Sequence, residues 1–302
     1  MPPVARDVRS GSASLGAGKN RFRLGPSPDR GAVALAPASG WVQWEQSPEN
    51  LVIGSDPEAG RPPQSVQAGL WLFAPNRDTQ GGSAWLCEVG DGDLLIDIPA
   101  FTKANLEMLQ QRCRRRSGWI VLTGRDGHGR CRRWQEALGW PVLVQEQESY
   151  LLPGVALLTR FADSFELVNG VRLLWTPGPS PGACVVHVRL DAQGAGAGSS
   201  AEPAGSAGGA SLDGLFCGRL LVPLAPQRLA PLRRRSCFHW PRQLRSVENL
   251  RQWLPAGCPD WIASGAGLGA LQGEKLVRSG AAQLAGLDLL QALHAPDPGL
   301  SS

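Results

Sequence analysis

The chain has 302 residues, of which 42% are hydrophobic, so it can bury the core of one large domain or two modest ones. Its net charge of +4 is too small to indicate nucleic-acid binding, and its arginine clusters are local. The 38 glycines and 25 prolines favour a loop-rich α/β or β-sandwich protein over a helical bundle. Seven cysteines without a C-x-x-C pair argue against a disulfide framework and a zinc ribbon. We find neither a membrane span nor a signal peptide and expect a cytoplasmic protein.

Composition divides the chain into three parts. Residues 1–40 are rich in Gly, Ser, Ala, Pro and Arg and lack hydrophobic periodicity, which predicts a disordered arm. A globular domain is expected over residues 41–278, with a flexible Ala/Gly/Ser insertion at 191–212. Residues 279–302 are expected to form a C-terminal tail that begins with an Ala/Leu-rich helical segment.

Hydrophobic periodicity and turn residues predict the elements of this domain. Strands are expected at 70–73, 83–89, 94–98, 119–122, 141–144, 157–161, 164–168, 171–175, 183–190, 215–217 and 261–263. Helices are expected at 103–115, 131–138 and from 242 onward. The arginines at 112–116, 130–133 and 233–235 are interpreted as solvated helix faces and loops. Hairpin-rich runs alternate twice with β–α units, which two packed sheets with outer helices would satisfy.

Two polar features stand at the ends of buried strands. Asp97 closes the apolar run Leu-Leu-Ile at 94–96, and a buried carboxylate there needs a partner. The loop Thr-Gly-Arg-Asp-Gly-His-Gly at 123–129 follows the apolar strand at 119–122. A loop that a buried strand carries to the edge of a sheet is a common location for a functional site.

The landmarks of the chain come in a definite order: L-L-I-D at 94–97, V-L-T-G-R-D-G-H-G at 121–129, T-P-G-P-S-P-G at 176–182, L-F-C-G-R-L-L at 215–221 and S-G-A-G at 264–267. Over roughly residues 66–276 this order resembles the metallo-β-lactamase superfamily. The segments 145–154 and 238–246 resemble a divergent branch of cyanobacteria and plastid-bearing plants. The resemblance implies an α/β fold, an αββα sandwich of two mixed β-sheets flanked by helices, with its site on loops at one edge.

Members of that superfamily bind one or two Zn²⁺ or Fe ions through imidazole and carboxylate ligands. The corresponding positions here are Gly124, Asp126, His128, Gly129, Pro179, Arg219 and Ala266. None keeps the family's residue, four have no ligating side chain, and the guanidinium of Arg219 is a cation. With four histidines in the whole chain, we expect no metal cofactor. A mononuclear Zn or Fe site formed by Asp126 and His128 with Asp97 or Cys131 is the alternative.

The resemblance also suggests what replaces the metal. Where the family has a bridging aspartate, this chain has Arg219, while Asp97 and Asp126 persist nearby in sequence order. An arginine can neutralise two buried carboxylates with good geometry, so we expect Arg219 to bridge them. The residual cleft is then predicted to contain Asp97, Arg125, Asp126, His128 and Arg219, and no residue is assigned a catalytic role.

Three functions follow from these observations. The favoured one is a pseudoenzyme that binds a small anionic ligand or a protein partner in a metal-free cleft, away from membranes. The second is a metal-dependent hydrolase of the superfamily with an unconventional site. The third, a nucleic-acid-binding role, has only scattered arginines in its favour, and we do not expect it.

Overall fold

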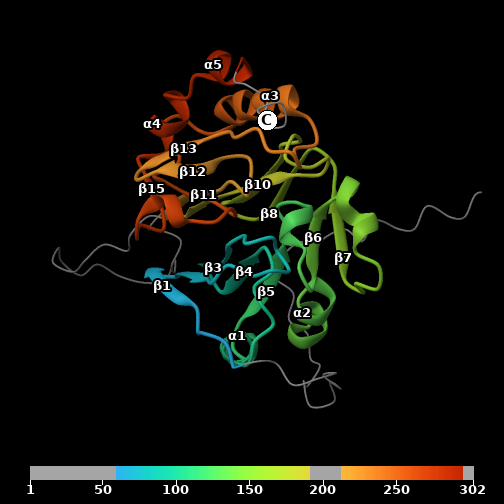
Figure 1. Ribbon diagram of the computed structural model, residues 1–302. Helices are drawn as coiled ribbons and strands as arrows, with labels where there is room; N and C mark the ends of the chain where they lie inside the picture. The colour runs from blue at the N-terminus through green and yellow to red at the C-terminus, as the bar shows by residue number, and fades with distance from the viewer. Residues whose placement is uncertain (1–58, 191–211, 295–302) are drawn as a thin grey trace, which may run out of the picture. The chain divides into compact units, whose positions relative to one another are not determined.

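The computed structural model describes residues 59–190 and 212–294, which all lie within one unit spanning residues 34–302 (Figure 1). The predicted arm at 1–40 and all but the last residue of the predicted insertion at 191–212 lie outside the described residues. Residue 212 begins a strand. Two sheets and a two-stranded ribbon form the strand framework of the described chain.

The first sheet contains seven strands in sequence order, so each strand lies beside its neighbour in the chain. Its strands are β1 (Gln64–Gln67), β2 (Leu70–Phe73), β3 (Ala84–Val89), β4 (Gly92–Ile96), β5 (Ser117–Val121), β6 (Val142–Gln145) and β7 (Leu158–Phe161). Strands β1 to β4 pair antiparallel and β4 to β7 pair parallel. The helices between the parallel strands therefore lie on one face of the sheet, as crossover connections require.

The second sheet has the order β15-β14-β11-β10-β9-β8. Its strands are β8 (Ser164–Val168), β9 (Val171–Trp175), β10 (Cys184–Leu190), β11 (Leu212–Phe216), β14 (Trp261–Ala263) and β15 (Val277–Arg278). Strands β11 and β14 pair parallel, and the other pairs are antiparallel. The ribbon consists of β12 (Val222–Ala225) and β13 (Arg228–Ala230).

Helices cover the outer face of each sheet. Below the first sheet in Figure 1 lie α1 (Lys103–Cys113) and α2 (Cys131–Leu138); with the second lie α3 (Trp240–Trp253), α4 (Gly280–Ala285) and α5 (Leu289–Leu293). Short 3₁₀ turns occur at Arg125–Gly127 (η2), Glu146–Leu151 (η3) and Gly269–Leu271 (η4). The predicted αββα sandwich of two mixed sheets is thus confirmed. No helix among the described residues has the length and apolarity needed to cross a bilayer.

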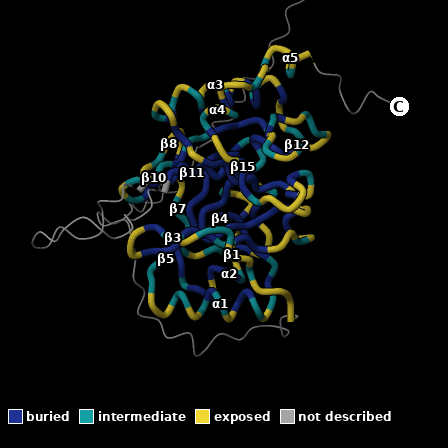
Figure 2. Tube along the Cα trace, turned by 90° about the vertical axis from the view of Figure 1, so that its left-hand side faces the viewer, coloured by how far each residue is buried: buried dark blue, intermediate teal, exposed yellow. Residues whose placement is uncertain are grey.

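Two hydrophobic cores hold these layers together. One core lies between the sheets, where Trp85 of β3 meets Phe216 of β11 at 6.2 Å between ring centroids, and Phe216 meets Trp261 at 5.4 Å. The other lies between the first sheet and its helices and includes Leu109 and Trp134. Buried residues accordingly follow the strands and exposed ones the outer turns of the helices (Figure 2).

An ion-pair network at one end of the first sheet corrects part of the sequence interpretation. Asp93 is fully buried and forms ion pairs with Arg112 at 2.8 Å and Arg116 at 2.9 Å. Arg112 also pairs with Glu88. These two arginines are therefore structural, since burying Asp93 without cationic partners would be costly. The interpretation of the cluster at 112–116 as merely solvated was wrong for both.

Candidate functional site

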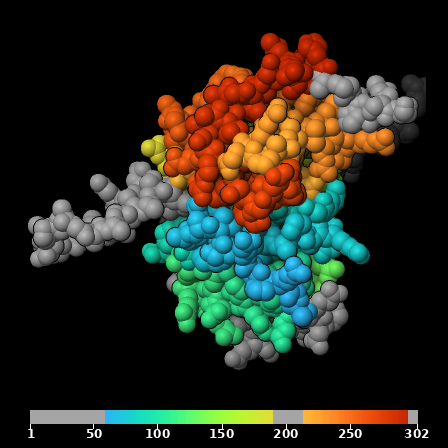
Figure 3. All heavy atoms as spheres, turned by 60° about the vertical axis from the view of Figure 1, so that its left-hand side comes forward, coloured from blue at the N-terminus to red at the C-terminus, as the bar shows by residue number. Residues whose placement is uncertain are grey.

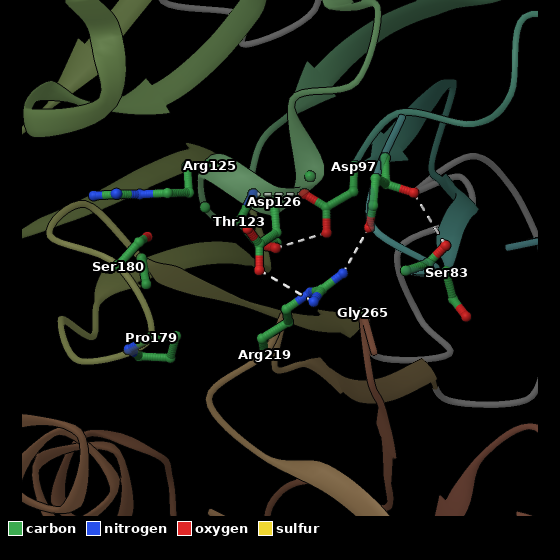
Figure 4. Close-up of a pocket in the computed structure, with 14 residues that line it drawn as sticks. Ser83, Asp97, Thr123, Arg125, Asp126, Pro179, Ser180, Arg219 and Gly265 are labelled. Carbon is green, nitrogen blue, oxygen red and sulfur yellow. Dashed lines mark hydrogen bonds and ion pairs between the residues drawn. The ribbon is translucent and has the colours of Figure 1, made fainter. Parts of the chain in front are cut away.

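The site is a pocket between the loops that follow β2, β4, β5, β9, β11 and β14 (Figure 4). It has a volume of about 370 Å³, including the space open to solvent. Its lining combines carboxylates, arginines and hydroxyls with many glycines: Thr79, Gly82, Ser83, Asp97, Thr123, Gly124, Arg125, Asp126, Gly127, Pro179, Ser180, Ala183, Arg219 and Gly265. Four of the five residues predicted for the cleft line it, namely Asp97, Arg125, Asp126 and Arg219.

Asp97 forms the buried floor of the pocket, directly after β4. Its Oδ1 accepts a hydrogen bond from the backbone N–H of Thr123 (2.8 Å), and its Oδ2 accepts one from the Thr123 hydroxyl (2.6 Å). Burial raises the pKa of Asp97 to about 6, against the lowering effect of the Thr123 hydrogen bonds and the charge of Arg219. Its backbone has a φ of 57°, a conformation uncommon outside glycine.

Two glycines allow this carboxylate to sit where it does. A Cβ added to Gly127 would overlap the Asp97 carboxylate, and one added to Gly265 would lie 3.1 Å from its Oδ2. The backbone thus approaches Asp97 from two sides, which explains why glycine follows both β5 and β14 here. The resulting carboxylate is buried, oriented and almost enclosed.

Arg219 enters the pocket from the loop after β11. One of its terminal nitrogens lies 3.1 Å from Asp126 Oδ2, and the other donates to the backbone carbonyl of Thr79 at 2.6 Å. Gln80 fixes the far side of the pair by donating to Asp126 Oδ1 at 3.1 Å. Burial lowers the pKa of Arg219, which the charge of Asp126 counteracts.

Arg219 was predicted to bridge the carboxylates of Asp97 and Asp126, but it binds only one of them directly. Arg219 makes an ion pair with Asp126, whereas Asp97 takes its hydrogen bonds from Thr123 and feels Arg219 through its charge. The reason is geometric: Thr123 follows the parallel strand β5, which lies beside β4, and it therefore occupies both carboxylate oxygens of Asp97.

Two serines face the pocket with different roles. Ser83 donates to the carbonyl of Ala266 at 2.9 Å and ties the β2–β3 loop to the loop after β14. Ser180 is 3% exposed, and its hydroxyl has no hydrogen-bond partner among the described residues. A hydroxyl buried at a pocket wall without a partner is available to a bound molecule or a water.

His128 does not line the pocket, contrary to the prediction. It is 8% exposed, and its Nε2 lies 3.8 Å from Oε2 of the fully buried Glu148, with neither atom hydrogen-bonded among the described residues. Burial and the charge of Arg125 lower the pKa of His128 to about 4. Its position follows from η2, whose tight turn carries His128 past the pocket and against η3.

A second hollow continues the pocket on the far side of Arg219. It shares Asp126, Pro179 and Arg219 with the first and adds Arg234 and the half-buried Cys237. Arg125, by contrast, extends away from Asp126 and Arg219 (Figure 4), with its Nε 3.9 Å from Glu148. The two hollows together are lined by three arginines, Arg125, Arg219 and Arg234, and two aspartates, Asp97 and Asp126.

The residues of this pocket do not fit the family's metal centre. Among the lining residues of the two hollows, the groups capable of coordination are two carboxylates, several hydroxyls and the single thiol of Cys237, without an imidazole. Zn²⁺ prefers nitrogen and sulfur ligands, and a cation here would have to displace the guanidinium from Asp126. The predicted alternative with His128 also fails geometrically, because His128 faces Glu148.

Comparison with known proteins supports the fold. No protein-family model and no curated protein matches the sequence. A solved structure of the DIM-1 metallo-β-lactamase exposed to ceftazidime matches with a TM-score of 0.50 and 14% identity, covering 76% of this chain and 95% of that one. A B3 metallo-β-lactamase with an active-site glutamic acid matches at 0.49 and 17% identity, covering 78% and 93%. The match to the DIM-1 structure shows that the chain has the metallo-β-lactamase fold.

Sequence reasoning missed the contribution of the β2–β3 loop. Thr79 and Gln80 hold Arg219 and Asp126 through a backbone carbonyl and a side-chain amide. Neither residue type carries a sequence signal for this role, since a carbonyl acceptor can belong to any residue. The unpartnered state of Ser180 likewise emerges only from the packing around it.

Proposed function

We propose that this protein is a pseudoenzyme that binds a small anionic ligand, a carboxylate or a phosphate group, in the metal-free pocket. The position of Arg219 carries the proposal. Its guanidinium is fixed inside the pocket by Asp126 and the Thr79 carbonyl, at the boundary between the two hollows. A preoriented guanidinium is the side chain best suited to bind planar or tetrahedral oxyanions.

Two neighbouring groups support the same ligand class. The Ser180 hydroxyl is buried at the wall of the pocket and needs a partner, which a ligand oxygen would provide. Arg234 adds positive charge in the adjoining hollow. A ligand oxyanion between these groups would compete with Asp126 for Arg219, so weak and salt-dependent binding is expected.

Anion binding is tested by thermal and chemical denaturation of the full chain at constant ionic strength. Inorganic phosphate and succinate serve as probes, with sodium chloride as the ionic-strength reference. Ligand at about 100 times its Kd stabilises a folded protein by about 2.7 kcal/mol, well above the error of such experiments. We expect at least one probe to raise the unfolding midpoint in a saturable manner.

Two variants assign that effect to the pocket. Arg219→Gln and Ser180→Ala should each reduce the shift, whereas Arg115→Gln removes a charge from an exposed position outside the pocket and should preserve it. An equal shift in wild type and Arg219→Gln would contradict the proposal. Metal content that is lost on Asp126→Ala would instead favour the metal-dependent hydrolase.

A further inference from the structure

A second polar cluster lies at the other end of the second sheet. Asp213 stands at the start of β11 and Cys258 precedes β14, while the pocket residues Arg219 and Gly265 follow the ends of these two parallel strands. The third member, His187, lies in the middle of β10, beside β11. The cluster is therefore separated from the pocket by the length of the strands.

The three side chains converge beneath α3. Each is at least nine-tenths buried, and one ligand atom from each lies within 4.8 Å of the others. His187 Nε2 is 2.9 Å from Asp213 Oδ1, and the edge of the Trp253 ring covers the imidazole at 6.1 Å between centroids. An imidazole, a carboxylate and a thiol that are buried together form a polar group that a bound ion would stabilise.

The hydrogen bonding of the cluster leaves one atom without a partner. His187 Nε2 interacts with Asp213, but His187 Nδ1 has no hydrogen-bond partner among the described residues. Burial and the hydrogen bond and charge of Asp213 raise the pKa of the Cys258 thiol to about 11. Without a bound ion, Cys258 thus keeps its thiol proton, and one ring nitrogen of His187 has no hydrogen-bond partner among the described residues.

A divalent cation would replace the thiol proton. Bound between His187, Asp213 and Cys258, it would displace the thiol proton and leave the imidazole neutral, with its proton on the nitrogen that does not coordinate. The guanidinium of Arg189, 3.6 Å from Cys258 Sγ, favours the thiolate as well. Two anionic ligands offset the charges of the cation and keep the enclosure close to neutral.

We propose that His187, Asp213 and Cys258 bind a borderline-soft divalent metal ion, with Zn²⁺ as the best match. One nitrogen, one oxygen and one sulfur suit Zn²⁺, whereas Mg²⁺ and Ca²⁺ prefer oxygen ligands. Three protein ligands leave a fourth position for water in tetrahedral geometry. The ion would connect β10, β11 and the segment before β14, so its effect would be on stability, independent of anion binding in the pocket.

Titration of the chelator-treated full chain with Cd²⁺ or Co²⁺ tests the site directly. A sulfur-to-metal charge-transfer band in the ultraviolet should saturate at one equivalent of metal. Release of about one proton per ion at neutral pH should accompany it, because the thiol loses its proton. Zn²⁺ should compete for the same site and raise the unfolding temperature.

Single substitutions identify the ligands. Cys258→Ser should abolish the charge-transfer band, and His187→Gln and Asp213→Asn should each weaken Zn²⁺ binding by about 100-fold or more. Cys237→Ser removes the thiol at the anion pocket, and Cys113→Ser removes a half-buried thiol elsewhere. Both controls should bind like the wild type.

The wild-type spectrum alone can overturn the proposal if a ligand variant fails to fold. Absence of a sulfur-to-metal band at saturating Cd²⁺ would exclude Cys258 as a ligand. A band that persists in Cys258→Ser, or disappears in Cys237→Ser, would assign the metal to another thiol. Because none of these measurements involves phosphate or succinate, their failure would leave the anion-binding proposal standing.

Discussion

Asp97 occupies an energetically unfavourable position at the floor of the pocket. Its carboxylate is buried, its backbone is left-handed, and its hydrogen bonds come from a single residue, Thr123. Such features persist where surrounding structure enforces them, and they concentrate at functional sites. Here they coincide with a residue that lines the pocket.

The raised pKa of Asp97 gives a pH dependence with a defined sign. Its folded-state pKa of about 6 exceeds the unfolded value of 3.8, so the folded state binds the proton more tightly. The stabilisation that protonation of Asp97 contributes to the folded state is fully present below pH 3.8 and is lost as the pH rises through about 6. Relative to Asp97→Asn, the wild type should therefore gain roughly 2 kcal/mol in unfolding free energy between pH 8 and pH 4.

Urea denaturation of both proteins across this range measures the difference directly. Asparagine suits the position because it tolerates the left-handed backbone and can exchange hydrogen bonds with the Thr123 hydroxyl. Subtracting the variant's curve removes the contribution of all other titrating groups. A difference in unfolding free energy that stays constant from pH 8 to pH 4, or that changes in the opposite direction, would show that burial does not raise the pKa of Asp97.

At the residue scale, the sequence predicted which residues lie in the pocket better than it predicted their hydrogen-bond partners. Comparison of motifs brought Asp97, Asp126 and Arg219 to one pocket, where they are found together. It could not predict that Thr123 would satisfy Asp97, because this depends on the register of β4 beside β5. Nor could it place His128, whose direction is set by the backbone geometry of the turn η2, which directly precedes it.

The proline-rich loop at 176–182 is the element that joins the pocket to α3. Ser246 of α3 donates to the carbonyl of Pro177 at 2.7 Å, and the backbone N–H of His239 donates to the carbonyl of Gly178 at 3.1 Å. His239 then caps α3 by accepting from the N–H of Arg242 at 3.2 Å. The loop is therefore clamped, and Ser180 is held at the pocket wall by backbone contacts.

Replacement of Gly178 by alanine should release this clamp. Gly178 has a φ of 151°, and an added Cβ would overlap the backbone of Gln243 in α3. Conformational strain and overpacking together should lower the free energy of unfolding by about 3 kcal/mol, measured in urea.

Gly139→Ala is the matched control for Gly178→Ala. Gly139 also has a left-handed backbone, with a φ of 66°, but a Cβ there would meet no atom within 4 Å. It should cost only about 1 kcal/mol, the ordinary penalty for alanine at a helix C-terminus. Equal losses for the two variants would show that contact with α3 adds nothing.

Periodicity and turn residues predicted some elements with their bounds and missed others. The helix at 131–138 and the strands at 70–73, 164–168, 171–175 and 261–263 have the predicted bounds. Strands β1, β12, β13 and β15, of two to four residues each, were not predicted; β1, β13 and β15 have no apolar run, and Pro223 interrupts the apolar run of β12. These short strands form by pairing with neighbouring segments of the fold. A short window of sequence contains no information about those segments.

At the scale of the whole described domain, the two halves of the chain meet along the core between the sheets. Figure 3 shows the N-terminal and C-terminal segments in direct contact, and specific bonds cross that boundary. Trp85 of the first sheet donates to the carbonyl of Ser264 at 3.1 Å, and Arg278 of the second donates to Gln67 at 3.2 Å. Neither sheet can expose its inner face without losing this shared core, so the two should unfold together.

Phe216 tests this coupling because its ring lies between Trp85 and Trp261. Its replacement by alanine removes a side chain that is 1% exposed and should lower the free energy of unfolding by about 3–5 kcal/mol. Phe238→Ala, at a ring that is 49% exposed, should change it by less than about 0.5 kcal/mol. In the Phe216 variant, tryptophan fluorescence and far-ultraviolet circular dichroism should still report one midpoint, since both sheets lose the same contact. Two separated midpoints would mean that each sheet with its helices folds independently. The shared core would then hold two folded halves together without being required for the folding of either.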